Sequence, residues 1–345
     1  MRKLVRVACA MVAALIAASA LPAVAQEILL KVHHFQPPIA TSHAQFMVPW
    51  CDKIAKESSN RLKCQIYPAM SLGGTPAQLY DQAKDGVADI VWTLPGYTAG
   101  RFPLSEVFEL PFMMTDTQAG SRALWDYVQL HAKEEFRDVR LLSLHVHGPG
   151  VIHARDRQVK ALDDLKGMKI RAPTRLTNRL LAALGATPVG MPVPAVPEAL
   201  SKGVIDGAVI PWEVVPSIKV QELTRFHTET DRNFPALYAA TFVFAMNPAK
   251  YNSLPADLKK IIDANSGAQL SSQAGALFAA ADAPARKLAE ARKNQFYTLP
   301  AAELAKWRKA AEPIQEDWIR ERNRDGQPGL KLVESARALI AKYSK

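Results

Sequence analysis

Short apolar segments alternate with helix-forming segments along most of this chain, and that order constrains its fold more than any other feature. The first part predicts strands at 27–34, 61–67 and 87–92, with helices at 43–58 and 76–84 between them. Prolines and glycines mark abrupt ends to these segments. Strands that alternate with helices are typical of a mostly parallel sheet, so we predict an α/β fold.

A second unit with the same order follows between 151 and 234. It predicts strands at 151–154, 169–171, 187–191 and 205–210, with helices at 176–184 and 196–202. An apolar strand at 237–246 is then expected to return to the first unit. From 256 onward the chain is Ala-rich and amphipathic, which predicts helices with breaks near 299–300 and 326–329.

The first 25 residues have the features of a secretory signal. Arg2, Lys3 and Arg6 give a positive start, an apolar run covers 7–21, and small residues precede a cleavage site near Ala25. The alternative is a membrane anchor, but the run is shorter than the roughly 20 residues that a spanning helix needs. We therefore expect export to the periplasm.

The expected location guides the interpretation of the net charge and of the cysteines. The formal net charge is +10, and removal of the three positive charges of the signal leaves +10 − 3 = +7. This mild excess favours anionic partners, but there is no dense Lys/Arg block of the kind that binds nucleic acid. Cys51 and Cys64 remain after the signal is removed. An oxidising compartment makes a disulfide between them the expected state, because a metal site would need more ligands than two thiols.

Motifs of the common catalytic classes are absent from the sequence. It has no Gly-x-Ser-x-Gly elbow, no His-Glu-x-x-His and no phosphate-binding loop, and Gly148-Pro149-Gly150 fails the dinucleotide pattern at His153. The eight histidines lack zinc spacing, so we expect no metal and no cofactor. His145 and His147 share one strand face, where they are either core histidines or a candidate base.

Arg171 is the strongest candidate for a binding residue. It ends a short strand, Pro173 stops that strand, and Thr174 is placed to cap the helix that follows. The fixed fork of donors on a guanidinium suits a carboxylate held by two hydrogen bonds. We therefore predict that Arg171 binds an anion.

The loop after the strand at 87–92 is a second candidate region. It contains Trp92, Thr93, Tyr97 and Arg101 among glycines and prolines. In open α/β sheets, ligands bind beyond the carboxyl ends of the strands, so this loop is expected to face the ligand.

The run at 165–174, Leu-Lys-Gly-Met-Lys-Ile-Arg-Ala-Pro-Thr, resembles the Leu-Lys-Gly-x-Lys-(Ile/Leu)-Arg-x-Pro signature of TRAP-transporter substrate-binding proteins, the DctP-type periplasmic receptors. Segments at 109–112, 185–188, 191–192, 198–200, 204–207 and 252–255 also match in the family's order, so the resemblance covers essentially the whole mature chain. It implies that Arg171 binds the ligand carboxylate.

The resemblance also implies a two-lobed periplasmic binding protein fold, type II-like, with lobes joined by crossing strands and a long helix. On this chain, lobe I would comprise 26–150 and 235–275, and lobe II 151–234. The remaining helices, 276–345, would pack across or beneath the lobes. The ligand would be trapped between the lobes as they close.

Departures from the family pattern indicate the type of ligand. A second arginine of sialic-acid-type members falls at Val151, a binding asparagine is replaced by Ile210, and a first-lobe arginine aligns near Tyr97. One arginine among aromatic loops suits a monocarboxylate with an apolar or aromatic body. The expected ligand-binding residues are Arg171, Trp212, Tyr97, Trp92, Phe35, Thr93, His147, Ile210, Arg101 and Thr174.

We therefore predict a periplasmic solute-binding protein, without catalysis, that delivers an organic carboxylate to the TRAP membrane permease and acts as a monomer. A sugar acid of the hexuronate type is the alternative ligand, with His147, Thr93 or Arg101 serving its hydroxyls. Two further alternatives are a secreted enzyme that uses His145 or His147 as a base, and an extracytoplasmic sensor that uses the same cleft.

Overall fold

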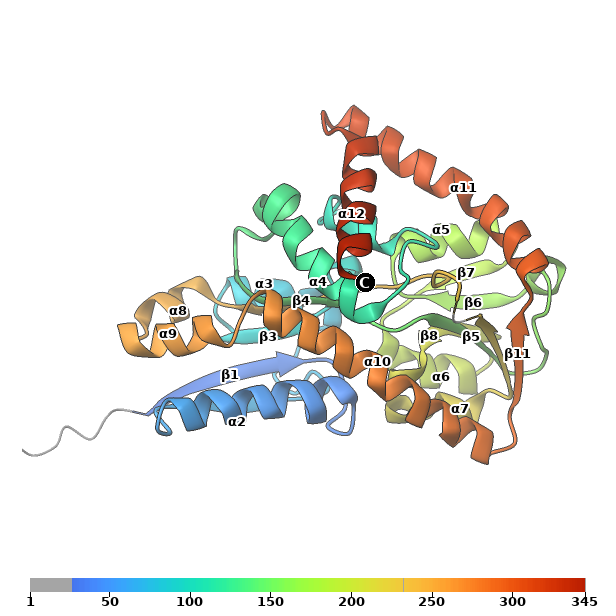
Figure 1. Cartoon of the computed structure of the whole chain (residues 1–345). Coiled ribbons are helices and arrows are strands. Elements are labelled where there is room, and N and C mark those ends of the chain that lie inside the picture. The colour runs from blue at the N-terminus through green and yellow to red at the C-terminus, as the bar shows by residue number, and fades with distance from the viewer. Residues whose placement is uncertain (1–26, 232, 345) are drawn as a thin grey trace, which may run out of the picture.

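Two mixed β-sheets form the centres of two lobes in this computed structural model, which describes residues 27–231 and 233–344 (Figure 1). The expected signal segment, 1–25, lies outside the described residues. In the described part of the chain, no helix combines the length and the apolar composition that a membrane crossing requires.

The first sheet has the strand order β2-β1-β3-β10-β4. Strand β1 pairs in parallel with β2 and β3, while β10 runs antiparallel to β3 and β4. Its strands are β1 (Ile28–His34), β2 (Leu62–Tyr67), β3 (Ile90–Thr93), β4 (Arg140–Val146) and β10 (Thr241–Met246).

The second sheet has the order β11-β9-β5-β8-β6-β7. Strand β6 lies between β7 and β8 and is parallel to both, whereas β5 is antiparallel to β8 and β9. Its strands are β5 (Gly150–Ala154), β6 (Lys169–Ala172), β7 (Thr187–Gly190), β8 (Gly207–Pro211), β9 (Phe226–Thr230) and β11 (Gln295–Leu299).

The antiparallel strands are those that enter a sheet from the other lobe. The chain leaves β4 in the first sheet and begins β5 in the second, and it leaves β9 in the second and begins β10 in the first. Each of β5 and β10 therefore starts at the cleft and runs away from it. The parallel strands β1, β3, β6 and β8 consequently end at the cleft, where α/β sheets bind ligands.

Helices cover the sheets, and one of them spans both lobes. Helix α10 packs on α4 and β4 of the first lobe and on the 3₁₀ turn Trp212–Ile218 of the second, and it crosses the molecule diagonally in Figure 1. The α-helices are α2 (Val48–Glu57), α3 (Leu79–Lys84), α4 (Thr117–Tyr127), α5 (Arg175–Ala183), α6 (Val196–Ser201), α7 (Val220–Leu223), α8 (Pro248–Ser253), α9 (Ala256–Ala264), α10 (Ala268–Ala291), α11 (Ala301–Arg324) and α12 (Gly329–Tyr343).

The C-terminal region differs from the expectation that only helices follow 256. Strand β11 lies between α10 and α11 and pairs in parallel with β9 at the edge of the second sheet. Its sequence, Gln-Phe-Tyr-Thr-Leu, is rich in residues that favour strands, so the local signal was present but is short. Through α10 and β11 the tail therefore contributes to the second lobe as well as covering it.

A disulfide joins Cys51 of α2 to Cys64 of β2, as predicted. The Cα atoms of the two cysteines are 5.7 Å apart, within the usual range for a bridged pair. The bond fixes α2 against β2, which is the edge strand of the first sheet.

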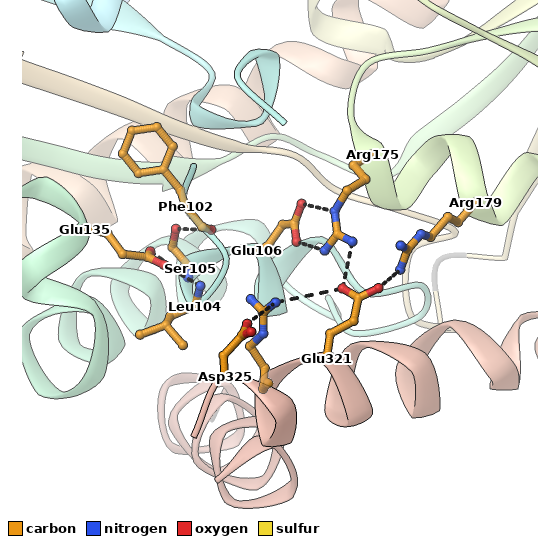
Figure 2. A network of polar contacts seen from close by, with 10 residues as sticks. Phe102, Leu104, Ser105, Glu106, Glu135, Arg175, Arg179, Glu321 and Asp325 are labelled. Atoms are coloured by element: carbon orange, nitrogen blue, oxygen red, sulfur yellow. Dashed lines mark hydrogen bonds and ion pairs between the residues drawn. The ribbon is translucent and has the colours of Figure 1, made fainter. Parts of the chain in front are cut away.

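The lobes also meet through a cluster of charged side chains (Figure 2). Glu106, in the first-lobe turn Ser105–Glu109, accepts two hydrogen bonds from Arg175 at the start of α5, one of them at 3.0 Å. Glu321 of α11 accepts from Arg175 at 2.8 Å and pairs with Arg179 at 2.7 Å. Glu106 is buried, so this pair is shielded from water far more than a surface ion pair.

We expect Arg175→Met to lower the free energy of unfolding by about 3 kcal/mol, because it leaves the Glu106 carboxylate buried without its partner. Urea denaturation measures the change. Arg137→Met is the matched control, since Arg137 is exposed and its contact with Asp138 is 3.9 Å long; we expect a loss below about 0.5 kcal/mol. Equal losses in the two variants would contradict a structural role for the Glu106–Arg175 pair.

Candidate functional site

A cavity lies between the lobes, at the carboxyl ends of the parallel strands. The first lobe contributes residues that follow β1, β3 and β4, and the second contributes residues at the ends of β6 and β8. The start of β10 and the segment before it close the cavity. It is lined by Phe35, Gln36, Leu94, Tyr97, His147, Arg171, Pro173, Val193, Ile210, Pro211, Glu213, Val214, Tyr238, Ala240 and Phe242.

Arg171 is the basic residue of this lining. It lies in β6, and its side chain is held by the backbone on either side: Nε donates to the Met191 carbonyl at 2.9 Å and Nη1 to the Val209 carbonyl at 3.3 Å. The residue is 2% exposed. In the described part of the chain Arg171 has no ion pair with a carboxylate, so a buried positive charge lines the cavity without a protein counter-ion.

Aromatic rings form the first-lobe wall of the cavity. Phe35 and Tyr97 meet edge to face at 5.5 Å, and Phe242 lies beyond them. The Tyr97 hydroxyl accepts a hydrogen bond from the backbone N–H of Val193 at 3.1 Å, which links this wall to the second lobe. The wall is therefore both apolar and fixed across the cleft.

Trp92 was expected to face the ligand, but it lies behind this wall. Its ring is fully buried and stacks on Phe35 at 5.1 Å and on Phe242 at 4.6 Å. Its indole N–H donates to His145 Nε2 at 2.9 Å. Trp92 does not line the cavity but supports two rings that do.

His147 lines the cavity, but the backbone uses both of its ring nitrogens. Nδ1 bonds to the Gly148 carbonyl and Nε2 accepts from the Ala240 N–H at 3.0 Å. His145 is engaged in the same way, by the Val146 carbonyl and by Trp92. Burial lowers the pKa of His147 to about 4 and that of His145 to about 3, so both rings are neutral near pH 7.

Tyr238 is a lining residue that the sequence analysis missed. Its ring packs on His147 with centroids 5.2 Å apart and occupies the space that a side chain at Gly150 would fill. A Cβ placed on Gly150 would come within 1.9 Å of the Tyr238 ring. Gly150 thus makes room for a cavity-lining tyrosine. Among the described residues, the Tyr238 hydroxyl has no hydrogen-bond partner.

Two other polar residues of the lining, Gln36 and Glu213, were also missed. Gln36 follows β1 and Glu213 follows β8, so they come from opposite lobes. Both side chains are buried. Their neighbours in the sequence, Phe35 and Trp212, had drawn attention because they are aromatic.

Four more predicted residues lie outside the cavity because other contacts hold them. Thr93 donates to the Pro76 carbonyl at 3.2 Å, and Arg101 pairs with Asp81 at 2.9 Å. Trp212 turns toward the second-lobe sheet and donates to Glu229 at 2.7 Å.

Thr174 is the fourth, and it lies where the lobes touch. It occupies the N-cap position of α5, but its hydroxyl meets Thr177 at 3.1 Å instead of capping a backbone N–H. A Cβ on Gly96 of the first lobe would lie 2.5 Å from the Thr174 methyl group. Of the ten predicted site residues, Arg171, Tyr97, Phe35, His147 and Ile210 therefore line the cavity.

The lining chemistry suits an organic anion better than a metal ion. Within residues 27–231 and 233–344, no group of three or more His, Cys, Asp or Glu side chains lies together as a metal site would require. One guanidinium, a free phenol hydroxyl and several aromatic rings instead offer charge, a hydrogen bond and apolar area.

Solved structures of high similarity are solute-binding proteins of TRAP transporters. One, from Rhodoferax ferrireducens T118 in complex with copurified benzoate, is 56% identical with a TM-score of 0.91 and covers 92% of this chain and 98% of its own. Another, from a marine metagenome and specific for aromatic acid ligands, holds 3-hydroxybenzoate. It is 49% identical with a TM-score of 0.91, over 93% of this chain and 100% of its own.

Sequence comparisons agree with the structural ones. The outer membrane transporter protein TsaT of Comamonas testosteroni is 27% identical over 95% of this chain and 96% of its own length. The family model for bacterial extracellular solute-binding protein, family 7 (DctP), matches residues 32–321. The chain therefore belongs to the DctP family, the solute-binding proteins of TRAP transporters.

Proposed function

We propose that this chain captures a monocarboxylate with an aromatic body in the periplasm and delivers it to the membrane permease of a TRAP transporter. The carboxylate pairs with Arg171, and the ring lies against Phe35, Tyr97 and Phe242. Closure of the lobes removes water from the pair and so strengthens it.

The observation that carries the proposal is the buried, unpaired charge of Arg171. A guanidinium this far from water requires an anion, since burial of an uncompensated charge costs several kcal/mol. Two backbone carbonyls hold its Nε and Nη1. The guanidinium also bonds to the Tyr97 hydroxyl. The donors that remain can bind a carboxylate, which fits the guanidinium fork.

The apolar wall favours an aromatic body over a sugar acid. Sugar acids carry several hydroxyls that each need a partner, whereas three aromatic rings cover one side of this cavity. The two solved relatives bind benzoate and 3-hydroxybenzoate, which supports the same class of ligand here.

Binding without chemistry is part of the proposal. The enzyme alternative needed His145 or His147 as a base, and in both rings the two nitrogens already have partners. An imidazole whose two nitrogens are both hydrogen-bonded has no free nitrogen with which to abstract a substrate proton.

We expect Arg171→Ala to weaken benzoate binding at least about a hundredfold, because a buried charge pair loses one partner, a cost of roughly 3 kcal/mol or more. Arg171→Lys should weaken it at least about tenfold, since a lysine cannot offer the same fork. Calorimetric titration measures both affinities, and thermal unfolding verifies that the variants fold.

Arg140→Ala is the matched control. Arg140 begins β4, at the end of the strand away from the cleft, and pairs with Asp263. Its removal should leave benzoate affinity unchanged. An Arg171→Ala protein that is folded and binds benzoate as tightly as the control would refute the assignment of the carboxylate site.

We expect Tyr238→Phe to weaken benzoate binding about tenfold, because a hydrogen bond from its hydroxyl to a charged group contributes about 1.5 kcal/mol. Tyr127→Phe is the control: the Tyr127 hydroxyl is also buried and unpartnered among the described residues, but it lies in α4 outside the cavity. Equal affinities in the two variants would show that Tyr238 contributes only its ring.

A thermal-shift panel separates the two ligand classes. Benzoate and phenyl-substituted acids should raise the unfolding midpoint, because a ligand that binds only the folded state stabilises it, while glucuronate and galacturonate should not. Each acid should also be recovered unchanged, in stoichiometric amounts. Stabilisation by the hexuronates alone would overturn the aromatic assignment, and sustained product would restore the enzyme alternative.

A further inference from the structure

Two buried polar side chains line the cavity with hydrogen-bonding capacity that the protein does not use. Gln36 Oε1 is buried without a hydrogen-bond partner in the described part of the chain. Glu213 is 7% exposed, and the one hydrogen bond it makes to a described residue comes from its backbone N–H, which leaves its carboxyl for the cavity. Buried polar groups are nearly always satisfied, and leaving one unsatisfied costs about 1–3 kcal/mol. A polar ligand group inside the cavity would therefore satisfy both side chains.

The backbone of each residue is fixed, so the position of each side chain is defined. The Gln36 N–H donates to His34 Nδ1 at 3.1 Å, and its carbonyl accepts from Ala69 at 2.9 Å. The Glu213 N–H donates to Asp282 Oδ1 at 2.9 Å, which attaches it to α10. The two side chains are thus presented to the cavity from opposite lobes by anchored segments.

The protonation of Glu213 is compatible with an anionic ligand. Burial, together with the negative charge of Asp282, raises the pKa of the Glu213 carboxyl well above its ordinary value. A neutral carboxyl neither repels the ligand anion nor competes for Arg171. It offers one O–H donor and a carbonyl acceptor, and the Gln36 amide likewise offers both functions.

We propose that Glu213 and Gln36 bind a hydroxyl group carried by the ligand, so that the cavity selects hydroxy-substituted aromatic monocarboxylates. This inference rests on the proposed function, because it assumes that Arg171 holds the carboxylate and the aromatic wall holds the ring. A hydroxyl has one donor and two acceptor positions, so it satisfies one side chain from each lobe. A second carboxylate at the same place is disfavoured, because the basic residue of the described lining is Arg171.

Titration of the unaltered protein with benzoate and with 2-, 3- and 4-hydroxybenzoate is the first test. We expect at least one hydroxy isomer to bind at least tenfold more tightly than benzoate. Equal affinity for all four acids overturns the inference while leaving the proposed function intact. If none of the four binds, the proposed function itself fails.

Glu213→Met and Gln36→Met then test the two residues, since methionine keeps the length of the side chain and removes the polar atoms. Each variant should lose the preference for the hydroxy isomer, measured as the ratio of its affinity for that isomer to its own affinity for benzoate. Glu213→Gln should keep the preference, because an amide mimics a neutral carboxyl. A folded Met variant of either residue that keeps the preference overturns the proposal.

Discussion

A permanent positive charge held away from water, at Arg171, is the constraint on which the rest of the cleft depends. The carbonyls of Met191 and Val209 satisfy part of the guanidinium, but carbonyl dipoles do not neutralise its charge. On the proposed binding mode a ligand carboxylate neutralises the charge, and the attraction between the two charges increases as the lobes exclude water. If Arg171 binds the carboxylate as we propose, affinity and closure are linked through one ion pair. The pair is strong only when water is excluded, and a closed cleft tolerates the charge only when an anion is present.

The topology explains how residues far apart in sequence reach this charge. The parallel strands of both sheets end at the cleft, and the crossing strands β5 and β10 begin there. Phe35, Tyr97 and Ile210 are thus the last residues of strands or the first of the loops that follow, whereas Tyr238 lies just before β10. Residues that follow the parallel strands and residues that precede β10 meet at one surface, because a strand that comes from the other lobe starts at the edge of the sheet where its neighbours end.

The sequence predicted the order of elements, the disulfide and the carboxylate-binding candidate, because each depends on local pattern or on the compartment. Arg171, Tyr97, Phe35, His147 and Ile210 line the cavity, and their binding roles stay predictions. Trp92 does not line the cavity, because its ring stacks on Phe35 behind the aromatic wall. The face to which a side chain points depends on the register of its strand, which the sequence alone does not give. Gln36, Glu213 and Tyr238 were missed because an unsatisfied side chain is visible only once its spatial neighbours are known. For Tyr238 the sequence contains one related feature: Gly150 has no side chain, and this leaves space for the Tyr238 ring.

The segment from the end of β6 to the start of α5 contributes both to the cavity and to the contact between the lobes. Arg171 and Pro173 line the cavity, Thr174 touches Gly96 of the first lobe, and Arg175 pairs with Glu106. These residues span five positions, so a shift of the segment moves the carboxylate site and the interlobe contacts together. The rigidity of proline within the segment limits such shifts. A carboxylate that binds Arg171 in the proposed way would therefore also fix the geometry in which Thr174 and Arg175 meet the first lobe, which links ligand binding to the contact between the lobes.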